Sequence, residues 1–142
     1  MKRVYLPLTG PQLQALRDTR RVADEELVGF SVTTVLIESL PASEDVEGHE
    51  YAALQEAALE SASRGGRVVV AADVDDEQVQ RPASGDEGSP GRVIVHEGLD
   101  LRRVVSLQVL DPAGERDPDS DLDLSWYDVT ELADLLAELG DA

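Results

Sequence analysis

The segment Arg67–Val74, RVVVAADV, places the strongest constraint on the fold of this chain. It is a continuous apolar run that follows a glycine pair and ends at aspartates. A strand whose side chains are apolar on both faces has to be covered on both faces. The run therefore predicts a central strand between two layers, which the rest of the chain has to supply.

Other segments have the composition of strands or the periodicity of helices. Strand-like runs rich in Val, Leu, Ile and Tyr span residues 2–8, 26–33, 92–97 and 103–111. Helical patterns begin at Pro11, after Thr33 or Thr34, at Glu47 and after Asp128. The last of these helices is preceded by a capping-box pattern, with Asp128 in the place of the usual Ser or Thr and Glu131 three residues later.

The order of these elements predicts one α/β or α+β domain over residues 1–142. We expect a mixed sheet of about five strands with three to four packed helices. The strand–helix alternation of the first half indicates a right-handed parallel crossover, and the later strands indicate a hairpin. The segments near 80–91 and 112–123 are rich in Gly, Pro, Ser and Asp, so we expect mobile acidic loops there.

The charge of the chain restricts its partners. Thirty acidic residues face 12 basic ones, for a net charge of −18. Such a surface repels nucleic-acid phosphates and anionic lipids, and it attracts cations or a basic protein. We therefore expect a basic protein partner and no direct binding to nucleic acid or membranes. Solubility, adaptation to salt and mimicry of a nucleic acid are alternative explanations of the same charge.

Two arginine pairs interrupt the acidic sequence. They are Arg20-Arg21 and Arg102-Arg103. Exposed arginines in a chain with so many carboxylates commonly form weak surface ion pairs. We expect these four side chains to pair with neighbouring carboxylates, without binding nucleic acid.

The sequence also limits the compartment and several classes of chemistry. Cysteine is absent, which excludes disulfides, thiolate zinc sites and cysteine nucleophiles. The amino-terminal MKRVYLPLTG lacks the apolar run of a signal peptide, and no stretch approaches the roughly 20 apolar residues of a membrane span. A cytoplasmic protein is therefore expected.

Alternate aspartates lead into the only tryptophan of the chain. Asp117, Asp119 and Asp121 match positions 1, 3 and 5 of a calcium-binding loop, and Asp128 matches position 12. However, Leu122 stands where the sharp turn of such a loop asks for glycine. The pattern favours the alternative, a solvated linker that the like charges keep extended.

The aromatic pair Trp126-Tyr127 permits two interpretations. It either anchors the end of this acidic segment on the sheet or forms an exposed contact for a protein partner. In the second case Asp119, Asp121 and Asp123 would steer a basic partner toward the pair. The scarcity of aromatic residues for the core, 4% of the chain, favours the anchor.

A third group of carboxylates follows the apolar residues Val68–Val70 of the central strand. Asp73, Asp75 and Asp76 lie where ligands of open α/β sheets bind. They would hold a divalent cation in a metal-dependent enzyme, or they would simply end the strand and cap a turn. The two histidines, His49 and His96, would contribute to a metal site only if the fold brought them together. The sequence contains no HExxH, no GxSxG and no phosphate-loop pattern.

Four segments carry a resemblance to a known family. They are MKRVYLPLT at the start, EYAALQEAALESA in the middle, GRVVVAADV, and SWYDVTEL near the end. The chain resembles an uncharacterised family of short acidic actinobacterial proteins that open with MKRVYLP, a domain of unknown function. The resemblance spans most of the chain outside the loops and implies no activity, cofactor or catalytic residue. The residues themselves favour a non-catalytic protein-binding or regulatory module, and the alternative is a divalent-metal-dependent enzyme.

Overall fold

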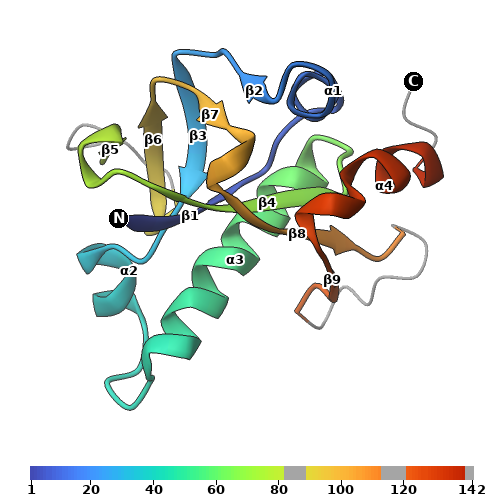
Figure 1. Cartoon of the computed structure of the whole chain (residues 1–142). Helices are drawn as coiled ribbons and strands as arrows, with labels where there is room; N and C mark the ends of the chain where they lie inside the picture. Colours follow the sequence, from blue (N-terminus) through green and yellow to red (C-terminus); the bar gives the residue numbers. More distant parts are fainter. Residues whose placement is uncertain (82–88, 113–120, 140–142) are drawn as a thin grey trace.

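The computed structural model describes residues 1–81, 89–112 and 121–139 (Figure 1). Its strands are β1 (Lys2–Leu6), β2 (Arg21–Val22), β3 (Glu26–Phe30), β4 (Val68–Val74), β5 (Val79–Gln80), β6 (Arg92–His96), β7 (Leu99–Asp100), β8 (Val104–Leu110) and β9 (Leu124–Tyr127). Its α-helices are α1 (Gly10–Thr19), α2 (Thr34–Ser39), α3 (Val46–Ser63) and α4 (Leu132–Glu138), and its 3₁₀ turns are η1 (Asp76–Gln78), η2 (Leu101–Arg103) and η4 (Val129–Glu131). Most of the predicted acidic loops, 80–91 and 112–123, lie outside the described residues.

A seven-stranded sheet forms the centre of this single α+β domain. Its order is β5-β6-β3-β1-β4-β8-β9, and β2 and β7 form a separate two-stranded ribbon. The predicted fold class is confirmed. The predicted mixed sheet of about five strands is wrong. The sheet has seven strands, and every strand pair among the described residues is antiparallel. The reason is the position of β1 between β3 and β4. These two strands, which α2 and α3 connect, run in the same direction, but each pairs with β1 instead of with the other.

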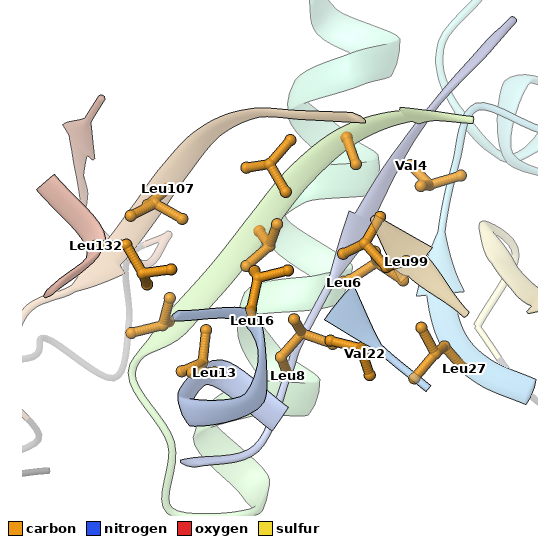
Figure 2. Close-up of a cluster of buried hydrophobic side chains, with 14 of the residues drawn as sticks. Val4, Leu6, Leu8, Leu13, Leu16, Val22, Leu27, Leu99, Leu107 and Leu132 are labelled. Atoms are coloured by element: carbon orange, nitrogen blue, oxygen red, sulfur yellow. The ribbon is translucent and has the colours of Figure 1, made fainter. Parts of the chain in front are cut away.

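The central strand β4 is covered on both faces, as its sequence predicts. Alternate side chains from Val68 to Val74 belong to a core that α1, α4 and the ribbon complete. Val69 and Ala71 point to the other face and pack with α3. Figure 2 shows the first core, whose side chains from separate elements include Leu13, Leu16, Val22, Leu99, Leu107 and Leu132.

Local capping explains where the helices begin. The side chains of Thr9, Thr33 and Asp45 accept backbone N–H groups at the first turns of α1, α2 and α3. The predicted capping box of Asp128 and Glu131 is present, and it opens η4, with α4 following directly. The four predicted helices are therefore confirmed. Among the described residues, no helix combines the length and the apolar composition that crossing a bilayer requires.

The ribbon of β2 and β7 is a feature that the sequence patterns do not predict, because each strand has two residues. The side chains of Val22 and Leu99 are buried in the first core (Figure 2). Gly98, just before β7, has a φ of 72°, and a Cβ at this position would lie 2.3 Å from the Val22 carbonyl oxygen. Beside the ribbon, the Leu101 N–H donates to the Arg20 carbonyl at 2.9 Å. Two segments about 80 residues apart in sequence are thus held in contact.

Glu56 gives the fold a testable pH dependence. Its carboxylate on α3 is half-buried and accepts the Gly91 N–H at 2.8 Å. Burial raises the pKa of this carboxyl above its ordinary value, so ionisation at neutral pH opposes folding. We expect Glu56→Gln to increase the free energy of unfolding at pH 7, because glutamine keeps an acceptor for Gly91 without the charge.

The sign of the pKa shift sets the pH range of this effect. Below the unfolded pKa of a glutamate, about 4.3, both states are protonated and the penalty disappears. The gain from Glu56→Gln should therefore shrink as the pH falls through the folded pKa toward that value. Urea denaturation at pH 7 and pH 4 measures the difference, and an equal gain at both pH values would contradict the burial of a charge as its cause.

Candidate functional site: the open edge of strand β9

Strand β9 forms one edge of the seven-stranded sheet (Figure 1). It pairs with β8, and no strand of the described residues lies on its other side. The Asp111 N–H donates to the Asp123 carbonyl at 3.3 Å, on the side of β9. The Leu110 N–H donates to the opposite side, to the carbonyl of Arg67, the residue before β4. Because main-chain groups alternate in direction along an antiparallel strand, the N–H and C=O groups of Leu124 and Trp126 point away from β8. Two residues of β9 thus offer their main-chain groups to a partner strand.

The aromatic pair is divided by the alternation of this strand. Tyr127 stands opposite Leu107 and packs against the first core, so it is the anchor. Trp126 stands opposite Gln108, and 62% of its surface is exposed. The anchor interpretation therefore holds for Tyr127 and fails for Trp126. A large exposed indole at an open strand edge is the kind of contact that protein interfaces use.

Helix α3 holds the segment that leads into β9. The amide of Gln55 donates to the Leu122 carbonyl at 2.8 Å and accepts the Leu122 N–H at 3.0 Å. One side chain thus satisfies both main-chain groups of Leu122, as a neighbouring strand would. Tyr51 donates its hydroxyl to Asp121 at 3.0 Å. Burial, followed by the hydrogen bond to Asp121, raises the pKa of Tyr51, which therefore stays a neutral donor. The edge is fixed by α3 up to Leu122, and beyond Leu122 no strand of the described residues pairs with it.

The described acidic residues around Trp126 separate into two groups. Asp121 and Asp123 are exposed on the segment beside Leu122. Asp117 and Asp119 lie outside the described residues, so the calcium-loop pattern is only partly described. Asp128 accepts the Thr130 N–H at 2.9 Å, and hydrogen bonds from Thr130 lower the pKa of its carboxyl. Asp128 therefore acts as a cap, and Asp121 and Asp123 are the exposed carboxylates of the segment that precedes Trp126.

Asp73 lies within β4, Asp75 and Asp76 follow it, and each of the three carboxylates has a separate local partner. Asp75 opens η1, where its N–H donates to the Gln78 side-chain oxygen at 3.2 Å, and its carboxylate lies 3.7 Å from Arg103. Asp76 lies 3.2 Å from the amino group of Met1. The structure thus supports the turn-capping interpretation of Asp75. Within residues 1–81, 89–112 and 121–139, no three acidic or histidine side chains gather in a way that would hold a metal ion.

Asp73 is the third of these carboxylates and belongs to a cross-strand pair. It stands opposite Arg3 of β1, and its oxygens accept from the Arg3 guanidinium at 2.6 Å and 3.3 Å. The hydrogen bond from Arg3 lowers the pKa of Asp73. Both side chains are more than a third exposed, so water screens the attraction between them. The pair stabilises the register of β1 on β4.

Removing the Asp73 charge should have a small effect that depends on pH. We expect Asp73→Asn to lower the free energy of unfolding by no more than about 1 kcal/mol at pH 7. A lowered pKa contributes stability above the ordinary aspartate value of about 3.9, and this contribution is lost as the pH falls through the folded pKa. Thermal unfolding at pH 7 and pH 2.5 measures the difference. A deficit that persists unchanged in acid would show that packing, and not charge, is responsible.

The histidines lie on different elements. His49 is in the first turns of α3, and His96 is the last residue of β6. The His96 ring lies 2.7 Å from the side-chain oxygen of Gln80 on the neighbouring strand β5. His96 is therefore occupied by a contact between two paired strands.

The edge strand has a sequence signal that the loop interpretation overlooks. Leu122 and Leu124 alternate with Asp121 and Asp123, which is the period of a strand with one polar face. The leucines do pack on the core beneath α3. Composition nevertheless predicts a loop for this segment, because aspartates are depleted in strands.

Comparison with known proteins yields the family of the chain. No curated protein and no solved structure matches it. Residues 2–136 match the model of one family, described as a family of unknown function (DUF6912). This match covers nearly the whole of the 142 residues, including every strand and helix of the described fold apart from the end of α4. The chain belongs to the DUF6912 family.

Proposed function

We propose that this protein is a non-catalytic binding module that takes up a basic, extended segment of a partner protein along the open edge of β9. The observation that carries the proposal is Trp126, 62% exposed on an edge strand whose main-chain groups face outward. An extended peptide added to such an edge gains main-chain hydrogen bonds, and side chains beside the edge supply specificity. Trp126 would contribute apolar contact area.

Charge supports a basic partner over a second copy of the same chain. Each copy has a net charge of −18 at neutral pH, so two copies repel one another. Asp121 and Asp123 are exposed beside the edge, and Asp119 lies two residues before Asp121 in the sequence. Carboxylates at the rim of an interface raise the rate of encounter with a basic partner more than they raise the affinity. We place the protein in the cytoplasm as part of the same proposal.

Affinity capture at two salt concentrations tests this function. The protein is immobilised, exposed to a lysate of its source organism at low and moderate salt, and the bound proteins are identified by mass spectrometry. Trp126→Ala removes the exposed indole. Ile37→Ala is the matched control, because Ile37 is also an exposed apolar side chain but lies on α2, far from β9 in Figure 1.

The expected result is one stoichiometric basic protein that the wild type and Ile37→Ala retain and Trp126→Ala loses. Its capture should weaken with salt, because exposed charges are screened over about 10 Å at 0.1 M. Capture that is unchanged in Trp126→Ala, or an absence of any stoichiometric partner at both salt concentrations, would overturn the proposal.

A further inference from the structure

The fold brings together the two arginine pairs that lie about 80 residues apart in the sequence. β2 pairs with β7 in the register Arg21 opposite Asp100, and the Leu101 N–H donates to the Arg20 carbonyl at 2.9 Å. Arg102 follows directly on η2. Five of the twelve basic residues of the chain, namely Arg17, Arg20, Arg21, Arg102 and Arg103, thus lie on α1, the ribbon and the turns next to them.

Three of these arginines border one hollow of about 510 Å³ between α1, η2 and the start of α4. They are Arg17, Arg20 and Arg102. The other described residues that line the hollow include Leu101, Val104, Val129 and Leu132, and none of the described lining residues is acidic. The volume lies in the range of small-molecule sites, roughly 300–1,000 Å³. The hollow therefore combines a cationic rim with an apolar floor.

The guanidinium groups at the rim differ in their partners. Arg17 is engaged by Asp18 through two contacts, at 2.7 Å and 3.1 Å. Within the part of the chain that the structure describes, the Arg102 guanidinium has only a distant pairing with Asp100, at 3.9 Å, and 76% of its side chain is exposed. No carboxylate of the described residues pairs with Arg20. The expectation that neighbouring carboxylates pair with both arginine pairs thus holds for Arg103 and, at 3.9 Å, for Arg102. Among the described residues it fails for Arg20 and for Arg21, whose guanidinium donates to the Glu97 carbonyl.

A purely structural role explains only part of this arrangement. Arg17 and Arg20 lie at the carboxyl end of α1, where cations interact favourably with the helix dipole. Arg102 has no such role, because it reaches the hollow from a different segment through the ribbon. Arg20 moreover has a φ of 62°, a conformation that favours glycine and costs a residue with a side chain about 1–2 kcal/mol. The arginine at this position therefore opposes local stability.

We infer that this hollow binds a small organic anion, a phosphate monoester or a carboxylate, whose remaining part is apolar. The Arg20 and Arg102 guanidinium groups would hold the anionic head, because their planar forks match phosphate and carboxylate oxygens. The apolar part of the ligand would lie against Leu101 and Val129. The net charge of −18 repels anions from most of the protein surface. An anion therefore needs local cations such as these two guanidinium groups in order to bind. The inference is independent of the partner edge at β9.

Titration with matched small probes, followed through the backbone amide signals by NMR, tests this site. Phenyl phosphate and benzoate combine an anion with an apolar ring, inorganic phosphate supplies the anion alone, and benzyl alcohol supplies the ring alone. The ring-bearing anions should bind more tightly than the other two probes and should shift the signals of Arg20, Leu101 and Thr130. The tighter of the two anions identifies the preferred head group.

Three variants relate this binding to individual arginines. Arg20→Gly should weaken phenyl phosphate binding about tenfold without lowering the unfolding temperature, because glycine suits the positive φ. Arg102→Ala should weaken binding to a similar extent. Arg64→Ala is the control, because it removes the same charge from an arginine that pairs with Glu60 outside the hollow. Absence of binding by both ring-bearing anions, or equal weakening by all three variants, would overturn the inference.

Discussion

Replacing Gly98 by alanine is expected to lower the free energy of unfolding by roughly 2–3 kcal/mol. Two effects add at this position. Its φ of 72° costs a residue with a Cβ about 1–2 kcal/mol, and that Cβ would lie 2.3 Å from the Val22 carbonyl oxygen. This oxygen belongs to the backbone of Val22, whose side chain is buried in the core beside Leu99. It therefore cannot move aside without disturbing the packing of Val22 and Leu99. Urea denaturation measures the loss.

Gly65 provides a matched control for Gly98→Ala. Its φ of 76° is nearly the same, but a Cβ there would meet no atom within 4 Å. Gly65→Ala should therefore cost only the conformational energy of the positive φ, about 1–2 kcal/mol. Equal losses in the two variants would show that the close approach of β2 and β7 contributes nothing. A larger loss for Gly98→Ala should be accompanied by weaker binding of phenyl phosphate, because the ribbon positions Arg20 beside Arg102.

Truncation of Trp126 is expected to have the largest effect on partner binding. We expect Trp126→Ala to raise the dissociation constant for the captured partner about 30-fold, which corresponds to about 2 kcal/mol. The reason is the loss of a large exposed indole at the centre of the proposed contact. Stability should change little, because 62% of this side chain is already in water. Calorimetric titration gives the affinity, and thermal unfolding gives the stability.

A second pair of variants separates the side chain from the strand edge. Trp126→Val and Trp126→Pro both remove the indole, but only proline also removes the outward-facing N–H. Proline is tolerated on edge strands whose N–H faces solvent, so the fold should persist in both variants. If the partner adds a strand to the sheet, Trp126→Pro should bind more weakly than Trp126→Val. Equal affinities would mean that the partner contacts the indole without pairing with β9.

The sequence predicts the layers of this fold better than the pairing within the sheet. The apolar run of β4 marks a strand covered on both faces, and capping residues mark the helix starts, because both depend on local chemistry. The insertion of β1 between β3 and β4 depends on contacts between distant segments, so an alternation of strands and helices cannot reveal it. For the same reason a two-residue ribbon such as β2 with β7 leaves no periodicity to detect.

The candidate site is predictable in its residues and not in their orientation. Trp126 and Tyr127 stand out in a chain with so few aromatics, but their separation onto two faces follows from the strand β9. The aspartates at the end of β4 and just after it are evident in the sequence, whereas their pairing with Arg3, Arg103 and the amino terminus depends on tertiary structure. The hollow lined by arginines cannot be predicted from the sequence either, since Arg20 and Arg102 are brought to it from distant segments by the fold.

The open edge of β9 also has a consequence for how the protein behaves in acid. An uncovered strand edge is a template for any extended chain, including another molecule of the same kind. At neutral pH the strong negative charge keeps identical molecules apart, and the aspartates around Trp126 act as gatekeepers against self-association. Near the isoelectric point, at about pH 4.2, this repulsion vanishes while the edge remains. Acidification therefore makes this open edge a route toward aggregation, with one sheet extending from molecule to molecule.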